Sequence, residues 1–368
     1  MKVGITGQNG FIGRHLYNFL RLQEGVTLIP YSKTFFTDEL RLQDFVKECD
    51  TIVHLAALNR HEDSDVLYNT NIQLTYKLIS ACEITNANPH ILISSSTQEN
   101  RDNPYGQSKK EARLRLEKWA EKNQGTTTGM IIPNVFGPFG KPFYNSFIAT
   151  FCHQVANDDK PTINEDSIVY LIYINELVQE IYKLIVSPVS GKVVVPSYHM
   201  IKVSEVLEKL LIYKESYMDT GEFPDLSSSF DLALFNTFRC YIPLNHFPKL
   251  YTKHTDDRGA FVEIARSNST GQFSYSSTKP GITRGNHFHT RKAERFAVIR
   301  GRASIKIRQI NSDSITEYIV DGDKPGFVDM PIWHTHNITN IGDDELVTLF
   351  WINEPYDPND SDTYFINV

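Results

Sequence analysis

Ser96, Tyr105 and Lys109 have the residue types and the spacing of an acid–base catalytic site. Tyr105 and Lys109 stand at i and i+4 at the start of a helical pattern, so they would share one helix face, one turn apart. An ammonium beside a bound cofactor's positive ring favours tyrosinate and would lower the pKa of the phenol. Ser96, at the end of an apolar run, would hold a substrate oxygen while Tyr105 transfers its proton. Because this spacing also occurs in many surface helices, it needs support from the rest of the chain.

A glycine-rich turn near the N-terminus supplies that support. Residues 2–6 predict a strand, and the glycines that follow it predict a tight turn into a helix. Such a turn lets the backbone approach a pyrophosphate, which would bind at the helix N-terminus. The predicted cofactor contacts in this turn are Gly7, Gly10, Phe11, Ile12 and Gly13.

The end of the second predicted strand, residues 26–31, bears on the choice of cofactor. An NAD-preferring site would carry an acidic residue there for the ribose hydroxyls, and this chain has none. Ser32 and Lys33 could instead bind a 2′-phosphate, which favours NADPH. The alternative is that Lys33 is an ordinary solvated lysine in a loop.

A third apolar run, residues 50–57, predicts another buried strand. Leu55, Ala56 and Ala57 follow its centre, and the small alanines would let a cofactor lie across the strand's carboxyl end. A histidine within such a run is usually a packed core residue, so His54 is given no role. With a further strand at residues 90–94, the alternation of strands and helices predicts an α/β, Rossmann-type, doubly wound parallel sheet.

Composition bounds the remaining possibilities. A length of 368 residues allows two domains, and 22% charged residues with a net charge of −7 give no basic surface for nucleic acid. The four cysteines form no Cys-x-x-Cys pair, so reduced, structural thiols are expected. The absence of any apolar run of membrane-spanning length predicts no membrane partner and a cytoplasmic enzyme.

Four motifs in order resemble the extended short-chain dehydrogenase/reductase family over about the first 240 residues. They are Thr6-Gly7-x-x-Gly10-Phe11-Ile12-Gly13, His54-Leu55-Ala56-Ala57, Ser94-Ser95-Ser96 and Tyr105-x-x-x-Lys109. The resemblance implies hydride chemistry at a sugar carbon of a nucleotide sugar, with Asn134 and Asn145 as substrate-binding residues. Ile131 stands where many members have an arginine. Dehydratases of this superfamily have two carboxylates after the active-site hydroxyl, and Thr97-Gln98 cannot replace them, so a ketone reductase is favoured.

The pattern changes after residue 259, where short alternating segments with turn residues predict an antiparallel barrel or sandwich. The helix predicted at 204–213 would complete the first domain, and Pro243, Pro248 and Lys249 mark a linker. The predicted domains are 1–245 and 246–368. The predicted strands of the second are 260–264, 271–276, 296–299, 303–308 and 316–320.

A set of metal-binding residue types lies within this second domain. His287 and His289 would project to one face of a strand, and Glu294 could join them across a hairpin. His334 and His336 form another i, i+2 pair. Three imidazoles and a carboxylate inside a barrel suit Zn²⁺, and Mn²⁺, Fe²⁺ or Ni²⁺ are chemically possible.

The spacing Gly281-x5-His287-x-His289-x4-Glu294-x6-Gly301 resembles the first motif of the cupin family. In the second motif Pro331, His336 and Asn340 fit, while Trp333 replaces a glycine. This alignment implies an all-β cupin barrel with His336 as the fourth ligand and His334 as a rival ligand or a catalytic base.

The whole chain, through the closing segment 357–365, resembles the bifunctional CapF-type enzymes of capsule and O-antigen synthesis. That resemblance implies a zinc-containing homodimer. Its cupin epimerises a UDP-2-acetamido-2,6-dideoxy-4-hexulose, a UDP-linked 4-keto-6-deoxy amino sugar, at C3. The reductase domain then uses NADPH to reduce C4, giving UDP-2-acetamido-2,6-dideoxy-L-talose on the way to UDP-N-acetyl-L-fucosamine. The alternative is a reductase whose cupin only binds sugar or dimerises the chain.

Overall fold

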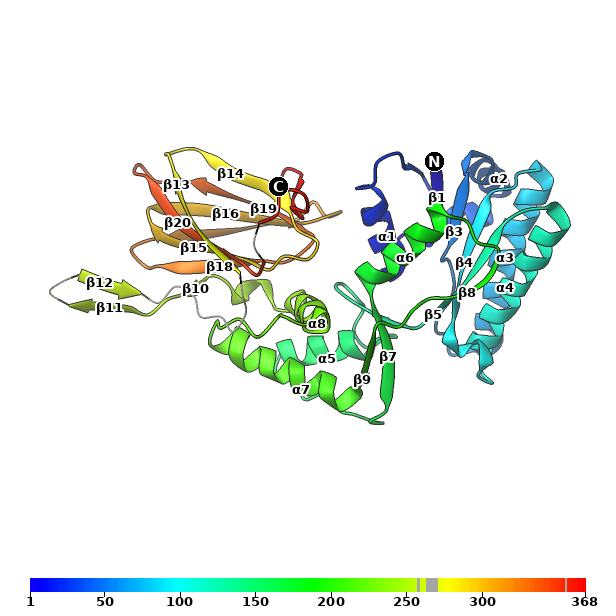
Figure 1. Cartoon of the computed structure of the whole chain (residues 1–368), viewed down its shortest axis with the longest axis horizontal. Helices are drawn as coiled ribbons and strands as arrows, with labels where there is room; N and C mark the ends of the chain where they lie inside the picture. The colour runs from blue at the N-terminus through cyan, green and yellow to red at the C-terminus, as the bar shows by residue number, and fades with distance from the viewer. Residues whose placement is uncertain (257–258, 263–270, 355) are drawn as a thin grey trace. The chain divides into compact units, whose positions relative to one another are not determined.

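A computed structural model of the protein divides into two compact units (Figure 1). It describes residues 1–256, 259–262, 271–354 and 356–368, with the side chains of residues 253–262 left undescribed. The first unit comprises Met1–Phe147 and Glu165–Val203, and the second comprises Ile148–Asn164 and Ser204–Val368.

The first unit is built on a six-stranded parallel sheet, which confirms the predicted doubly wound fold. Near-continuous apolar runs form its central strands, as is typical of strands covered on both faces. In sheet order the strands are β2 (Thr27–Ile29), β1 (Lys2–Thr6), β3 (Thr51–His54), β4 (His90–Ser96), β5 (Thr127–Ile132) and β8 (Gly191–Val194).

Helices cover both faces of this sheet (Figure 1). One face carries α1 (Phe11–Leu20) and α6 (Ile174–Val186), which pack on each other. The other carries α2 (Glu39–Glu48), α3 (Ser64–Thr85) and α4 (Pro104–Asn123), with α3 between the other two. Because the chain leaves β1 for β2 on one side and reaches β3 on the other, the strand order reverses between β1 and β3. Ligands of such sheets bind outside the carboxyl ends of the strands at this point.

Shorter elements extend the first unit beyond the sheet. They are the 3₁₀ segments η1 (Lys33–Thr37) and η2 (Thr97–Asn100), and a three-stranded sheet of β6 (Asn134–Phe136), β7 (Ile168–Tyr173) and β9 (His199–Lys202). Helix α5 (Phe147–Ala156) begins at the last residue of the unit's first segment.

The second unit contains two five-stranded antiparallel sheets, as predicted for a cupin-like barrel. The first is β10 (Lys249–Leu250), β18 (Gly326–Met330), β15 (Glu294–Arg300), β20 (Leu346–Ile352) and β13 (Gln272–Thr278). The second is β17 (Ile315–Asp321), β16 (Arg302–Gln309), β19 (His334–Asn340), β14 (Thr283–Phe288) and β21 (Tyr364–Phe365). Both sheets contribute to one apolar core that includes Phe296, Ile305 and Val328. A separate hairpin pairs β11 (Lys253–Asp256) with β12 (Gly259–Val262), so the end of the strand predicted at 260–264 lies outside the described residues.

Residues 204–245, which the sequence assigns to the first domain, belong to the same compact unit as the barrel. The elements of this region are α7 (Val203–Tyr213), the π-helical segment η3 (Lys214–Asp219), α8 (Ser229–Arg239) and the short η4 (Leu244–His246). Tyr217 Oη donates to Asp329 Oδ2 on β18 at 2.6 Å, and the rings of Phe223 and Trp351 lie 4.1 Å apart. Aromatic burial against the barrel therefore holds this region, whereas the predicted boundary at residue 245 remains a prediction.

Candidate active sites

The glycine turn after β1 requires glycine at two of its positions. Gly7 has φ +76°, and a Cβ there would lie 2.7 Å from the Ala56 nitrogen. A Cβ at Gly13 would lie 2.3 Å from the Gly7 oxygen. Gly10 is the N-cap of α1, and among the described residues no side chain caps it and no acidic residue lies in the first turn. The amides at this helix N-terminus are thus available to an anion such as a pyrophosphate.

Hydrogen bonds link the carboxyl ends of β1 and β3 beside this turn. Thr6 Oγ1 and His54 Nδ1 lie 2.7 Å apart, and the Ala56 amide donates to Thr6 Oγ1 at 3.3 Å. Burial lowers the pKa of His54 to about 3, so its ring is a neutral packing group, in line with its having no assigned role. Leu55 and Ala57 are half-buried where the chain leaves β3, next to Gly7.

Ser32 and Lys33 lie where β2 ends, on the strand next to β1. Ser32 Oγ accepts a hydrogen bond from the Thr34 amide at 3.3 Å and caps η1, while the Lys33 side chain is exposed. Gln8 Nε2 donates to the Tyr31 carbonyl at 3.3 Å and links the glycine turn to this strand end. The structure thus brings the predicted cofactor residues of three strands to one edge of the sheet.

Ser96 ends β4, and the other two predicted catalytic residues lie in the first two turns of α4. Asn103 caps this helix by accepting a hydrogen bond from the Gly106 amide at 2.7 Å. A Cβ at Gly106 would lie 2.1 Å from the Gln98 oxygen, so the helix start packs directly on the segment after Ser96. Ser96 Oγ accepts from the Gln98 amide at 3.2 Å, which leaves the hydroxyl proton able to donate to a substrate.

The pKa values of this site are dominated by burial. Burial lowers the pKa of Lys109, which is 5% exposed, to about 8, and the charge of Glu99 opposes this. Burial raises the pKa of Tyr105, with a smaller contribution from Tyr144. The lowering of the phenol pKa that is expected beside a bound cofactor stays a prediction, and without the cofactor burial raises this pKa. A tyrosine that keeps its proton is suited to donate it.

Glu99 lies close to these residues and is already fully engaged. It accepts from Arg113 Nε at 2.8 Å and Arg113 Nη2 at 3.0 Å, and Ser95 Oγ also donates to it. Burial opposes ionisation of Glu99, but these hydrogen bonds hold its pKa below the usual value. A carboxylate paired in this way is not available for the acid–base work of dehydration.

Asn71, on α3, is a residue that sequence reasoning missed. Its Nδ2 donates to the Leu58 carbonyl and to Ser108 Oγ, each at 3.0 Å, and its Oδ1 accepts from the Leu58 amide at 2.7 Å. Ser108 Oγ donates to the Tyr105 carbonyl at 2.8 Å. Asn71 therefore connects the loop after β3 to the helix turn of Tyr105. Its only sequence signal is a polar residue at a buried helical position.

Asn134 and Asn145, the predicted substrate contacts, are both exposed. Asn134 begins β6, and Asn145 precedes α5 by two residues. Near Asn145, the Tyr144 carbonyl accepts a 3.4 Å hydrogen bond from Arg60. Their role in binding substrate stays a prediction.

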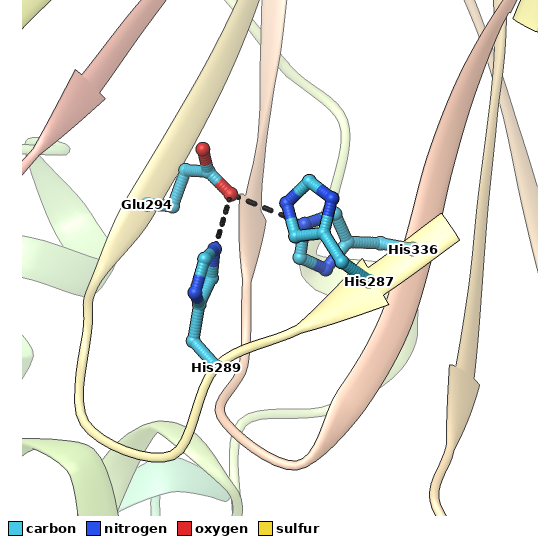
Figure 2. Close-up of side chains that lie close together, drawn as sticks. All are labelled: His287, His289, Glu294 and His336. Carbon is cyan, nitrogen blue, oxygen red and sulfur yellow. Dashed lines mark hydrogen bonds and ion pairs between the residues drawn. The ribbon is translucent and has the colours of Figure 1, made fainter. Parts of the chain in front are cut away.

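In the barrel, His287, His289, Glu294 and His336 point toward one another (Figure 2). His287 lies on β14 with His289 just beyond it, Glu294 begins β15, and His336 lies on β19. Their potential ligand atoms all lie within 4.8 Å of one another. Glu294 Oε2 is 3.2 Å from His289 Nε2 and 3.1 Å from His336 Nε2.

Hydrogen bonds on the far side of two rings fix which nitrogens face this cluster. His289 Nδ1 lies 2.6 Å from the Asp362 carbonyl, and His336 Nδ1 lies 3.1 Å from the His334 carbonyl. A carbonyl oxygen only accepts, so each Nδ1 carries a proton, and each ring in its neutral form presents the Nε2 lone pair to Glu294. His336 Nε2 is buried and makes no hydrogen bond among the described residues. Lone pairs facing a carboxylate at this distance need a cation or extra protons between them, so the donor set fits a metal ion.

The pKa directions agree with that electrostatic arrangement. Burial and the neighbouring His336 lower the pKa of His287 to about 4, so its ring is neutral and can act as a ligand. Burial opposes protonation of His289, but its hydrogen bond to Glu294 raises its pKa. Burial also opposes ionisation of Glu294, and its contacts with His289 and His336 nevertheless hold its pKa well below the usual range.

His334 is not part of the cluster that the described residues form. It is the first residue of β19, its Nδ1 lies 2.9 Å from the Ile332 carbonyl, and burial lowers its pKa to about 4. Trp333, which replaces the usual glycine of the second cupin motif, has φ +58°. Its amide donates to the His289 carbonyl at 2.7 Å, and its ring stacks on Phe288 at 5.5 Å. Trp333 therefore adopts the left-handed backbone conformation without being glycine, and its hydrogen bond and ring stacking stabilise that conformation.

A cavity of about 450 Å³ opens beside the cluster. Two of the four cluster residues, His287 and Glu294, reach its surface. Arg284 lies at its edge, where it donates to Thr278 Oγ1 and the Ser277 carbonyl, both at 3.1 Å. The remaining lining residues are Ser274, Tyr275, Ser276, Ser277, Gly285, Phe296, Ile338 and Phe350. The volume and the mixture of apolar and polar groups are typical of small-molecule sites.

Within the described residues, no helix is long and apolar enough to span a bilayer. Residues 3–195 match the family described as the NAD dependent epimerase/dehydratase family, and residues 254–364 match the polysaccharide biosynthesis C-terminal domain.

Three known proteins show the extent of the similarity. A UDP-2-acetamido-2,6-beta-L-arabino-hexul-4-ose reductase from Pseudomonas aeruginosa is 35% identical over 373 residues, covering 100% of this chain and 99% of that protein. The capsular polysaccharide assembling protein CapF from Staphylococcus aureus is 36% identical, with a TM-score of 0.64 and 100% of each chain covered. RMD from Pseudomonas aeruginosa, solved with NADPH, is 20% identical with a TM-score of 0.53, covering 58% of this chain and 82% of its own. That last likeness shows the fold alone.

Proposed function

Because this chain belongs to the CapF-type members of the NAD dependent epimerase/dehydratase family, we propose that it carries out two successive steps on a UDP-linked 4-keto sugar. The barrel inverts C3 of a UDP-2-acetamido-2,6-dideoxy-4-hexulose. The first unit then reduces C4 with NADPH to UDP-2-acetamido-2,6-dideoxy-L-talose, toward UDP-N-acetyl-L-fucosamine. The observation that carries the proposal is that one chain holds two separately built sites: Ser96, Tyr105 and Lys109 in one unit, and a histidine–glutamate cluster beside a cavity in the other.

The reduction assigns a role to each residue of the first site. NADPH, when bound on the glycine turn, supplies the hydride to C4. Ser96 donates its free hydroxyl proton in a hydrogen bond to the C4 oxygen, and Tyr105 transfers its proton to that oxygen as the carbonyl becomes an alcohol. Lys109 holds positive charge close to the phenol and the cofactor. The raised pKa of Tyr105 supports the role of proton donor.

Several residues would hold the cofactor. Its pyrophosphate would bind the amides after Gly7 and Gly10, and Ser32 with Lys33 would bind a 2′-phosphate. Asn134 and Asn145 would contact the substrate. The exposed side chain of Lys33 and the lack of an acidic residue at this strand end support NADPH over NADH.

In the barrel, His287, His289, Glu294 and His336 would hold one Zn²⁺ ion. A bound Zn²⁺ ion supplies a Lewis acid for a carbonyl oxygen. The C3 proton is acidic only while C4 is a ketone, because its removal gives an enolate. The cavity beside the cluster has room for the sugar, and Arg284 at its edge offers a positive charge to the anionic part of the substrate. The family resemblance further supports a homodimer that acts in the cytoplasm.

The P. aeruginosa relative is named only as a reductase, which favours one alternative: a reductase whose barrel binds sugar or dimerises the chain. Deuterium exchange separates the two. The full chain is incubated with the UDP-4-keto sugar in D₂O without NADPH, and the sugar is examined by NMR and mass spectrometry. Incorporation of deuterium at C3 is expected, and NADPH added afterwards should give the 4-alcohol. Reduction without any earlier exchange at C3 would support the reductase alone.

A further inference from the structure

The cluster in the barrel depends on the short loop between two of its members. Residues 290–293 join His289 to Glu294, so any shift of this loop changes the distance between a ring nitrogen and a carboxylate that now lie 3.2 Å apart. The position of the cluster is therefore set by whatever fixes the loop backbone.

Asp362 is the residue that fixes it. Its Oδ1 accepts from the Thr290 amide at 3.0 Å and from Thr290 Oγ1 at 2.7 Å. Its Oδ2 accepts from the amides of Arg291 and Lys292, each at 3.0 Å. Three successive backbone N–H groups that converge on one carboxylate form an anion-binding concavity. The Asp362 side chain is only 3% exposed, so these are hydrogen bonds shielded from water.

The backbone of Asp362 also acts on the cluster directly. Its carbonyl is the group, 2.6 Å from His289 Nδ1, that determines which nitrogen of this ring faces Glu294. To present both groups at once, Asp362 has φ +43°, a conformation that Asp and Asn tolerate better than most residues. One residue thus holds both the loop and the ring.

Neighbouring residues of the C-terminal segment strengthen this attachment. The buried Lys292 Nζ donates to the Ser361 carbonyl at 2.7 Å, and Arg291 bonds Asp360 and Glu354 at 3.0 Å each. Strand β21 pairs with β14 so that Phe365 lies opposite His287. The segment therefore contacts the backbone around two of the four cluster residues.

We infer that Asp362 is a positioning residue of the metal site, whose carboxylate shapes the 290–292 loop and whose carbonyl orients His289 toward the metal. This inference rests on the proposed function, because it takes the cluster to be a metal centre. Groups that orient metal ligands from behind typically change metal affinity by about 10- to 100-fold when they are replaced.

The test uses the full-length chain stripped of metal and titrated with Co²⁺ in competition with a chelator, with the Co²⁺ absorption spectrum recorded at saturation. Asp362→Asn keeps the size of the side chain and tolerates its backbone angle, but an amide NH₂ would face N–H donors. It is expected to bind Co²⁺ about 10- to 100-fold more weakly, with a changed spectrum and with NADPH binding unaltered. Asp343→Asn is the control: Asp343 is an exposed acidic residue of the same unit, in the turn between β19 and β20, and takes no part in this attachment, so wild-type affinity is expected.

Thr290→Val provides a milder variant in case Asp362→Asn folds poorly. It keeps the shape of the side chain and deletes one of the four donors to Asp362, so a loss of affinity of a few-fold is expected. Wild-type affinity and an unchanged spectrum in both variants would overturn the inference. A wild-type chain that binds no Co²⁺ would contradict the proposed metal centre, and the inference would fall with it. If Asp362→Asn binds Co²⁺ more weakly but the wild-type chain shows no exchange at C3, the result supports the positioning role and counts against the epimerase.

Discussion

Lys109 Nζ donates a 3.1 Å hydrogen bond to Ser94 Oγ, and Ser94 in turn donates to the His54 carbonyl at 3.4 Å. One ammonium thereby links α4 to the ends of β4 and β3. The predicted catalytic serine ends β4, and the predicted cofactor alanines follow β3. These contacts hold the Lys109 ammonium in a buried position. Because burial lowers its pKa, the charge is sensitive to pH.

Reduction should decline as pH rises through about 8. Burial lowers the pKa of Lys109 to about 8 from an ordinary value near 10.5, so the cation is present below pH 8 and is lost above it. The pKa of Tyr105 is raised, so the phenol does not titrate in this range. We expect kcat/KM for the 4-keto sugar to fall about tenfold for each pH unit above 8. A profile that stays level well above pH 9 would contradict this assignment.

Tyr105→Phe should lower reduction by about 10²- to 10⁴-fold while NADPH still binds. The substitution deletes the proton donor and little else, because the ring and its packing remain. Turnover is measured with the 4-keto sugar, and NADPH binding by nucleotide fluorescence. Tyr76→Phe, at an exposed position on α3, is the control and should keep full activity. Near wild-type turnover in Tyr105→Phe would remove Tyr105 from the mechanism.

Lys33→Ala should weaken the preference for NADPH over NADH. The lysine follows β2, where the adenosine ribose is expected, and its exposed ammonium would bind only the phosphate-bearing cofactor. We expect KM for NADPH to rise about tenfold, or ~1.4 kcal/mol, with KM for NADH unchanged. Lys47→Ala, in which an exposed lysine of α2 is removed, should affect neither. Equal effects on both cofactors, or an initial preference for NADH, would show that this strand end does not select the cofactor.

The sequence predicted those parts of the structure that short-range patterns determine. Apolar runs bounded by turns indicated β1 to β4 of the first unit and β13, β15, β16 and β17 of the second. Two glycines of the turn motif, Gly7 and Gly13, stand where a Cβ would be blocked. The spacing of His287, His289 and Glu294 indicated a cluster because strand alternation and one hairpin bring these residues together. His334 and His336 could not be separated by pattern, since both lie on one strand face; only the packing of β19 places His336 with the others.

Long-range contacts account for what the sequence did not indicate. The apolar residues from Lys214 to Arg239 have the same pattern whichever unit they bury against, so their packing on the barrel, through Tyr217 and Phe223, had no local signal. Asp362 is one of several acidic residues near the C-terminus, and it lies about 70 residues from the loop it fixes. The balance of burial and charge at Tyr105 likewise depends on the folded environment.

Removal of one ring should identify the metal ligands. The wild-type chain, prepared without chelators, should contain about one metal ion per chain, and His289→Ala should lose it. His334→Ala is the control: it also removes an imidazole of the barrel, half-buried and outside the cluster, so the metal should remain. Elemental analysis measures both. Loss of metal from His334→Ala and not from His289→Ala would show that the proposed ligand set is wrong. A wild-type chain without metal would exclude the metal centre.

Epimerisation should precede reduction, and substitutions confined to one site should separate the two steps. Once C4 is an alcohol, the C3 proton has no adjacent carbonyl to stabilise the carbanion, so the barrel must act on the keto sugar. A chain with both Ser96→Ala and Tyr105→Phe should therefore still exchange the C3 proton with solvent deuterium. His287→Ala should lose this exchange while it keeps NADPH binding in the first unit.

A chain that ends near residue 243 should also lack the exchange, but it is a weaker test. Tyr217 and Phe223 bury their rings against the barrel, so this truncation exposes them and should destabilise the region that remains. The point substitution at His287 leaves that packing intact and is the sharper comparison. If exchange vanishes with Tyr105 and survives the loss of His287, the epimerase lies in the first unit and the proposed division between the two sites is wrong.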